Sequence, residues 1–327
     1  MVHTEETLGR LAAIPDLTVI PGAPLSRYTR FAIGGPADLY AETCSPESFI
    51  AALHVAQESG GPYVVIGGGT NLIVSDEGFR GTVLRYTADR IVATEHGVVA
   101  DSGAVLQNLV DFTVERGLKG LETLAGIPGW VGAAVYGNAG AYGHSISERV
   151  RKVRFYDGRG VRVSDASECE FRYRESIFKR RKEWIIFSIE LEMETGGADE
   201  LLKISNDIIR VRNEKFPVTM KCAGSIFKNL LVSDLPEGLA ARVPHRVIRE
   251  GKVPAAYFLE EVGGKGMSRG DIHVAAYHAN LIYNGGAGTA ADLRALIGEL
   301  KRRVAEKFSL SLEEEVQYVG FPEAARP

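Results

Sequence analysis

Three consecutive glycines followed by two short polar residues form the segment best suited to bind an anion. Gly67, Gly68 and Gly69 stand in the run Y-V-V-I-G-G-G-T-N-L-I-V-S-D, residues 63–76. Glycine lets the backbone take positive φ and lets a ligand approach the main chain, so successive N–H groups can form a nest for a phosphate. A tight hairpin between two buried strands explains the same glycines equally well. A P-loop or a dinucleotide-binding turn is excluded, because the first needs G-K-[ST] and the second opens a helix.

A second group of polar residues lies in the C-terminal third of the chain. Ser225 follows a glycine in M-K-C-A-G-S-I-F-K-N, and its type alone favours a turn residue. The run Glu313–Glu315 is typical of a solvated strand edge, on which Glu313 and Glu315 would share one face. Cys222 is expected to be a small buried residue and not a nucleophile. Residue types alone therefore assign no reaction to these positions.

The composition narrows the class of protein. The 327 residues include 38 Lys+Arg and 42 Asp+Glu, a formal net charge of -4, and no long basic run, which argues against a nucleic-acid partner. Residues 1–10 lack a signal-peptide pattern and no apolar run is long enough for a membrane span, so we expect a cytosolic protein without a membrane partner. Cys44, Cys169 and Cys222 are too widely spaced for a zinc site or a disulfide framework, so no metal is expected.

The order of expected helices and strands predicts three α+β units, at residues 1–88, 89–197 and 198–327. Helix signals are clearest where Ser45 precedes Pro46 and where Thr289 and Asp292 form a capping pair. Further helices are expected at 105–116 and 198–213, and strands at 63–66, 72–74, 82–85, 97–101, 184–193, 279–283 and 313–319. A hairpin is expected at 150–163 around residues 157–160.

The segment Leu124–Gly143 has an unusual composition. It reads L-A-G-I-P-G-W-V-G-A-A-V-Y-G-N-A-G-A-Y-G, which is too rich in glycine and alanine for an ordinary core and too poor in polar residues for a free linker. Small residues of this kind let a backbone approach a ligand closely. The composition therefore suggests a main chain that wraps around a flat ligand.

Taken together, these segments resemble the UDP-N-acetylenolpyruvoylglucosamine reductases, flavoenzymes of peptidoglycan precursor synthesis. The resemblance rests on V-I-G-G-G-T-N-L-I-V-S-D, G-L-E-T-L-A-G-I-P-G with N-A-G-A-Y-G, Y-R-E-S-I-F-K, A-G-S-I-F-K-N, Y-H-A-N and L-E-E-E-V, in family order. It implies an α+β fold: a two-subdomain FAD-binding fold of the vanillyl-alcohol oxidase type plus a third α+β substrate-binding domain. The short connection between Met193 and Ala198 resembles the shorter, type II branch of the family.

The resemblance also implies a reaction and its residues. Hydride passes from NADPH to FAD and then to the vinyl carbon of UDP-N-acetylglucosamine enolpyruvate, which leaves carbanion character beside the carboxylate. Arg174 matches the arginine that stabilises this charge, since a guanidinium grips a carboxylate through two parallel hydrogen bonds. Glu315 matches its carboxyl partner, which donates a hydrogen bond if burial keeps it protonated. Ser225 matches the proton donor, with Lys228 as a nearby positive charge.

Other roles follow from the same matches. FAD is expected to bind non-covalently, and His144 is expected to be a solvated loop residue. The UDP-sugar is the small-molecule partner, with substrate contacts from Tyr173, Lys228, Asn229 and Asn280, and the protein is expected to be a monomer. The implied FAD contacts are Ile33, Gly34, Gly35, Pro36, Ile66, Gly67, Gly68, Gly69, Thr70, Asn71, Leu72, Ala125, Gly126, Pro128, Gly129, Gly132, Ala133, Asn138, Gly140, Ala141 and Tyr142.

Two alternatives stand beside this interpretation: an FAD-dependent alcohol or sugar oxidase of the same fold, and a nucleotide-binding module without catalysis. Neither has a use for the arginine, serine and glutamate motifs together. One departure from the family pattern is Trp130, which stands where a small residue is usual after I-P-G. Alanine replacement of Glu313 or Glu314 is expected to affect activity mildly, and replacement of Glu315 severely.

Overall fold

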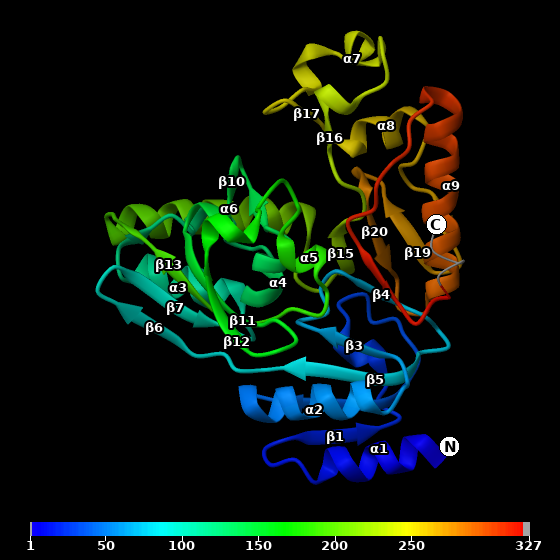
Figure 1. The fold of residues 1–327 in the computed structure, drawn as a ribbon. Helices are drawn as coiled ribbons and strands as arrows, with labels where there is room; N and C mark the ends of the chain where they lie inside the picture. Colours follow the sequence, from blue (N-terminus) through cyan, green and yellow to red (C-terminus); the bar gives the residue numbers. More distant parts are fainter. Residues whose placement is uncertain (1, 323–327) are drawn as a thin grey trace. The chain divides into compact units, whose positions relative to one another are not determined.

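The computed structural model describes residues 2–322, and the chain divides into two compact units (Figure 1). The first unit comprises Ala37–Gly68, Arg80–Pro217 and the described part of Met1–Ala23. The second comprises Pro24–Pro36, Gly69–Phe79 and the described part of Val218–Pro327. The chain therefore passes from one unit to the other inside the glycine triplet, after Gly68. Within residues 2–322, no helix is both long and apolar enough to cross a membrane.

The first unit begins with a four-stranded sheet of strand order β1-β2-β5-β3. Its helix α2 starts where the sequence predicts, because the Ser45 hydroxyl accepts a hydrogen bond from the Ser48 N–H and Pro46 is the first helical residue. Phe49 and Leu53 of α2 are buried in the core of this sheet. The elements are α1 (Val2–Ala12), α2 (Pro46–Glu58), β1 (Thr18–Pro21), β2 (Ala37–Thr43), β3 (Tyr63–Ile66) and β5 (Phe79–Tyr86).

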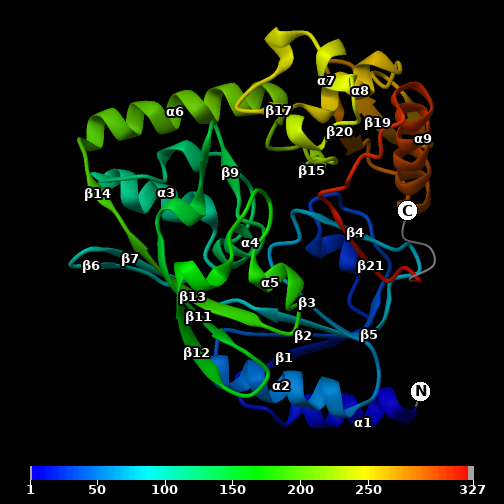
Figure 2. The same cartoon turned by 45° about the horizontal axis from the view of Figure 1, so that its top comes forward.

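A five-stranded antiparallel sheet of order β12-β11-β13-β7-β6 forms the rest of the first unit. Helix α6 lies along α3 and belongs to this unit (Figure 2). The strands are β6 (Ile91–Thr94), β7 (Gly97–Asp101), β11 (Val150–Tyr156), β12 (Val161–Asp165) and β13 (Ile185–Glu192), with short pairs β8 (Leu118–Lys119), β14 (Glu194–Thr195) and β9 (Gly140–Ala141), β10 (His144–Ser145). The helices are α3 (Leu106–Glu115), α4 (Val131–Tyr136), α5 (Ile177–Arg180) and α6 (Ala198–Lys215).

The second unit is a four-stranded antiparallel sheet of order β15-β20-β19-β18 that carries α8 and α9. Thr289 caps α9 as predicted, because its hydroxyl accepts from the Asp292 N–H at 3.0 Å. The strands are β15 (Lys221–Ser225), β18 (Ser268–Arg269), β19 (Ile272–Ala275) and β20 (His278–Asn284), with β16 (Leu230–Leu231), β17 (Lys252–Val253), β4 (Leu72–Val74) and β21 (Gln317–Val319) in separate pairs. The helices are α7 (Leu239–Arg242), α8 (Ala255–Glu261) and α9 (Ala290–Phe308).

Short 3₁₀ turns complete the chain. They are η1 (Leu25–Tyr28), η2 (Glu122–Leu124), η3 (Ile146–Glu148), η4 (Ala166–Cys169), η5 (Val232–Asp234) and η6 (His245–Val247).

The structure corrects the hairpin interpretation of the glycine triplet. Strand β3 pairs in parallel with β5, whereas β4 pairs in parallel with β21 from the end of the chain. The two strands that flank the glycines therefore belong to different sheets and do not form a hairpin. The glycines allow the main chain to leave one sheet and enter another.

Three further expectations meet different outcomes. The hairpin around residues 157–160 is confirmed by the pairing of β11 with β12. The strand expected at 313–319 is shorter, because only Gln317–Val319 pairs with β4, while Glu314 forms an isolated bridge to Phe227. The segment 124–143 contains helix α4, which its composition did not predict. The three-unit division stays a prediction.

Candidate active site

Close contacts of the main chain explain why the triplet is glycine. Gly69 has φ +67°, and a Cβ on it would lie 1.8 Å from the carbonyl oxygen of Tyr28. The Gly69 carbonyl accepts from the Arg30 N–H at 3.0 Å, which ties the triplet to the segment that leads to Ile33. In the first unit, a Cβ on Gly68 would lie 3.0 Å from the indole of Trp130. A side chain is thus excluded at Gly69 and would fit at Gly68 only if the Trp130 indole shifted, so the main chain of the triplet stays uncovered, as a main-chain anion site requires.

A positive charge is fixed beside the glycines in the first unit. The guanidinium of Arg85 donates to the Gly67 carbonyl at 3.1 Å and lies 4.2 Å from the centroid of the Trp130 ring. Its side chain is 15% exposed, and it also contacts Tyr40 and Glu42. Burial and the hydrogen bond to Glu42 raise the pKa of Tyr40 above its usual range, so its hydroxyl stays neutral.

The residues present fit an FAD diphosphate. Residues 66–72 and 30–36 contain no aspartate or glutamate, so these two segments themselves place no like charge beside a bound phosphate. In the first unit, Arg85 supplies a positive charge beside Gly67, and the glycine triplet presents main chain instead of side chains. The donor chemistry of this segment therefore matches a cofactor diphosphate.

The predicted arginine, Arg174, occupies a strained turn in the first unit. Arg172 and Glu175 exchange main-chain hydrogen bonds of 3.0 and 3.1 Å, which closes a two-residue turn at Tyr173 and Arg174. Arg174 has φ +56°, a conformation that is unfavourable for a residue with a Cβ. Its guanidinium donates to the carbonyl of Gly140 at 2.7 Å and more weakly to that of Asn138 at 3.4 Å.

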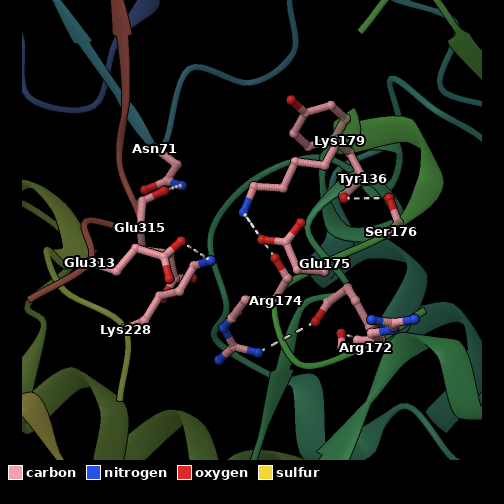
Figure 3. A network of polar contacts seen from close by, with 11 residues as sticks. Asn71, Tyr136, Arg172, Arg174, Glu175, Ser176, Lys179, Lys228, Glu313 and Glu315 are labelled. Carbon is pink, nitrogen blue, oxygen red and sulfur yellow. Dashed lines mark hydrogen bonds and ion pairs between the residues drawn. The ribbon is translucent and has the colours of Figure 1, made fainter. Parts of the chain in front are cut away.

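The turn is anchored to the glycine-rich loop that the sequence assigns to the cofactor. The hydroxyl of the fully buried Ser176 donates to the Tyr136 carbonyl at 2.7 Å (Figure 3). The amide nitrogen of Asn138 donates to the Arg172 carbonyl at 2.8 Å. Asn138 itself has φ +43° and is 5% exposed. The Y-R-E-S motif and the N-A-G-A-Y-G motif therefore form one connected substructure.

In the second unit, the main chain of Glu315 is hydrogen-bonded to the residue that follows Ser225. The N–H of Glu315 donates to the carbonyl of Ile226 at 2.7 Å, and Ile226 directly follows Ser225. The N–H of Lys228 in turn donates to the carbonyl of Glu313 at 2.9 Å. The segments 225–228 and 313–315 thus run side by side, as the resemblance implies for a joint site.

The side chains of the three glutamates point to different partners. Glu313 is 71% exposed at its side chain and pairs with Lys228. Glu314 is 8% exposed, accepts from Lys301 at 2.8 Å and forms a short hydrogen bond with Tyr318, whose pKa is raised by burial and by this bond. Glu315 is half-buried. Glu314 is therefore a structural residue.

The substrate contacts expected in the second unit have structural partners. Asn280 is 2% exposed, and its amide accepts from the N–H of Phe227 and donates to the carbonyl of Phe227, both at 2.9 Å. Asn229 is exposed, and its amide oxygen accepts from the Ala255 N–H at the start of α8. Lys228 is 8% exposed. Asn280 therefore supports the strand that carries Ser225, while a direct substrate contact stays a prediction.

Two polar residues of the V-I-G-G-G-T-N-L-I-V-S-D motif have partners that the sequence did not reveal. The amide nitrogen of Asn71 donates to the carbonyl of Glu315 at 2.9 Å (Figure 3), and the N–H of Gln317 donates to the Asn71 carbonyl. The carboxylate of Asp76 accepts from the N–H groups of Ala290 and Ala291 at the start of α9. The motif thus positions Glu315 as well as exposing glycines.

The remaining predicted cofactor residues of the first unit lie in α4 itself or in the segments on either side of it. Ala125 is fully buried in the hydrophobic core, so only its main chain is open to a ligand role. The Gly126 N–H donates to Gln107 at 2.6 Å, and the Gly132 N–H donates to the Ser102 carbonyl at 2.8 Å. Tyr142 has φ +53° and is 51% exposed. The individual FAD contacts stay predictions.

Histidine and cysteine chemistry is not evident in residues 2–322. His144 is exposed, as expected, and contacts Glu148, but it lies in the short strand β10 and not in a loop. Cys169 and Cys222 are buried free thiols and Cys44 is an exposed one, and burial raises the pKa of Cys169 to about 12. No group of His, Cys, Asp or Glu in this part of the chain could hold a metal ion.

Sequence profiles of two domain families match the chain. The FAD binding domain matches residues 37–164, and the C-terminal domain of UDP-N-acetylenolpyruvoylglucosamine reductase matches residues 216–319. The first profile covers both sheets of the first unit only in part, and the second covers most of the second unit.

Curated relatives and a solved structure agree with these matches. The chain is 66% identical to the UDP-N-acetylenolpyruvoylglucosamine reductase of Solibacter usitatus over 95% of this chain and all of that protein. It is 35% identical to the enzyme of the same name from Carboxydothermus hydrogenoformans, over 92% of this chain and 94% of the relative. The crystal structure of the Thermus caldophilus reductase superposes with a TM-score of 0.71 at 28% identity, covering 93% of this chain and 98% of that one.

Proposed function

Since the chain belongs to the UDP-N-acetylenolpyruvoylglucosamine reductase family, we propose that Arg174, Ser225 and Glu315 carry out its reaction. The protein is an FAD-containing oxidoreductase of peptidoglycan precursor synthesis, with the FAD-binding fold and C-terminal domain that the resemblance implies. The reaction is the NADPH-dependent reduction of UDP-N-acetylglucosamine enolpyruvate to UDP-N-acetylmuramate. The observation that supports the residue assignment best is the hydrogen bond of the Glu315 N–H to the carbonyl of Ile226, the residue directly after Ser225.

Bound FAD supplies the hydride carrier between NADPH and the substrate. The residues proposed to hold it are the glycine triplet with Thr70 for the diphosphate, the segment 33–36, and the loops around α4. Arg85 supports the triplet through the Gly67 carbonyl. The individual contacts are proposals that rest on the motif matches and on the absence of acidic side chains in residues 66–72.

Hydride addition to the vinyl carbon places negative charge on the neighbouring carbon and its carboxylate. Arg174 is proposed to bind the carboxylate, because a guanidinium offers two parallel donors in a plane. Glu315 is proposed to be the carboxyl partner that donates a hydrogen bond to the developing charge. Ser225 is proposed to give its hydroxyl proton to the carbon, which completes the addition of hydride and proton across the double bond.

Lys228 can support the proton transfer from Ser225 electrostatically. Its ammonium group lies in a side chain that is 8% exposed and pairs with Glu313. A buried cation near a hydroxyl lowers the free energy of the transient alkoxide. The lysine is therefore proposed as an electrostatic partner of the serine, as well as a contact for the UDP-sugar.

The finer statements on partners and location are also proposals. The net charge of -4 and the lack of a basic run support a protein without a nucleic-acid partner. We propose that the chain acts as a monomer in the cytosol, where NADPH and nucleotide sugars are available.

The function is tested with the purified yellow protein under anaerobic conditions. NADPH is expected to bleach the flavin, and addition of UDP-N-acetylglucosamine enolpyruvate is expected to restore the oxidised spectrum with formation of UDP-N-acetylmuramate. The oxidase alternative predicts two different results. The enolpyruvyl compound would leave the flavin reduced, and flavin that had been reduced by an alcohol or a sugar would be reoxidised by air. Release of the yellow colour by acid denaturation tests non-covalent binding.

A further inference from the structure

Lys179 of α5 contacts both the main chain and the side chain of the turn that carries Arg174. Its ammonium group donates to the main-chain carbonyl of Arg174 at 3.0 Å and to the carboxylate of Glu175 at 2.9 Å (Figure 3). The side chain is 21% exposed and comes from the last turn of α5. The bond to Glu175 is an ordinary i,i+4 pair, but the bond to the Arg174 carbonyl fixes a peptide orientation.

That peptide belongs to the most strained residue of the proposed catalytic set. Arg174 has φ +56°, which costs conformational energy for any residue with a Cβ, so surrounding contacts must hold it. The turn is closed by main-chain bonds between Arg172 and Glu175. The cation of Lys179 adds a charge-assisted hydrogen bond to the carbonyl at the strained position itself.

The conformation decides where the guanidinium points. With φ positive at Arg174, the side chain reaches the Gly140 carbonyl at 2.7 Å and the Asn138 carbonyl at 3.4 Å. If the turn relaxed to a negative φ, the Cα–Cβ bond would swing away from this loop. A misplacement of about 1 Å in a catalytic group lowers rates by roughly 100-fold.

We propose that Lys179 is a positioning residue for Arg174: it holds the left-handed turn so that the guanidinium meets the substrate carboxylate. This inference rests on the proposed role of Arg174. The proposed role of Lys179 does not include a contact with the substrate or the cofactor. It acts through the Arg174 carbonyl, and the ion pair with Glu175 is secondary.

The test is a double-mutant cycle on the FAD-loaded enzyme, read as the rate at which the enolpyruvyl substrate reoxidises NADPH-reduced flavin. Lys179→Met is expected to slow this step at least about 10-fold, with little change in flavin reduction by NADPH. In an Arg174→Ala background the same substitution is expected to have less than about a 2-fold further effect, because coupled residues are not additive. Glu175→Gln, the matched control, removes the ion pair and keeps the lysine, so it is expected to lose less than about 3-fold.

Two results would overturn the inference: losses that multiply in the Arg174→Ala background, or a loss in Glu175→Gln equal to that in Lys179→Met. Lys179→Arg keeps a cationic donor and serves if Lys179→Met does not fold. Lys179→Arg is expected to slow reoxidation less than Lys179→Met, and this effect must also be absent in the Arg174→Ala background. Failure of the proposed function is distinguishable, because the unmodified enzyme would then not be reoxidised by the enolpyruvyl compound at all.

Discussion

Alanine replacement at each of the three consecutive glutamates separates stability from catalysis. Glu314 is 8% exposed and binds both Lys301 and Tyr318, so Glu314→Ala removes one partner of a buried ion pair. Such a loss costs about 3–5 kcal/mol of unfolding free energy. Glu313 is 71% exposed, so its pair with Lys228 is partly screened by water, and Glu313→Ala is expected to cost less stability than Glu314→Ala.

Activity is expected to follow a different order. Glu315→Ala removes the proposed hydrogen-bond donor to the developing charge, which should slow flavin reoxidation by the enolpyruvyl substrate at least about 100-fold. The N–H of Glu315 still bonds to Ile226, so the pairing of the two segments is retained. Folded Glu313→Ala and Glu314→Ala enzymes are expected to keep reoxidation within about 10-fold of the unmodified rate.

The assays are urea unfolding for stability and stopped-flow absorbance for reoxidation, both on protein of equal flavin content. Glu314→Ala should be the least stable variant and Glu315→Ala the slowest. If Glu313→Ala were the slowest, the assignment of Glu315 would be one strand repeat out of register. If Glu314→Ala were as stable as the unmodified protein, its two side-chain contacts would not contribute as the structure indicates.

Two further predictions use matched variants. Gly69→Ala should abolish FAD binding, because its Cβ would collide with the Tyr28 carbonyl. Binding is measured as flavin content and by titration of the apoprotein with FAD. The control Gly22→Ala has a similar φ and nothing within 4 Å of its Cβ, so it should only lower the free energy of unfolding by about 1–2 kcal/mol. Normal flavin content in Gly69→Ala would contradict this. Asn280→Leu and Asn284→Leu each remove a buried amide from β20 and should lose similar stability in urea, but only the first, which binds Phe227, should slow reoxidation. Equal slowing of reoxidation in the two variants would contradict a specific role of Asn280 in supporting the segment beside Ser225.

Local signals in the sequence predicted local structure correctly. Ser45 before Pro46 marked the start of α2, and Thr289 with Asp292 marked the start of α9, because a cap is determined by residues three positions apart. The glycine triplet was predicted to admit a ligand, which stays a prediction, while the close approach of the Tyr28 carbonyl to Gly69 was not predicted. The family and its fold were also recognised from short motifs.

Pairings between distant segments were not predictable in the same way. Strand β4 pairs with β21, and Asn71 binds the Glu315 carbonyl across 244 positions of sequence, and neither leaves a periodic signal. Helix α4 was missed because glycine and alanine in Leu124–Gly143 have no hydrophobic period that marks a helix. The contact of Lys179 with the Arg174 carbonyl depends on a turn geometry that residue types do not encode.

The role of Ser225 is tested by measuring both half-reactions of the Ser225→Ala enzyme. Flavin reduction by NADPH is expected to stay close to the unmodified rate, because the serine takes no part in it. Reoxidation by UDP-N-acetylglucosamine enolpyruvate is expected to slow at least about 100-fold, as for a lost proton donor. An equal loss in both half-reactions, or unimpaired reoxidation, would contradict the assignment of Ser225 as the proton donor beside Glu315.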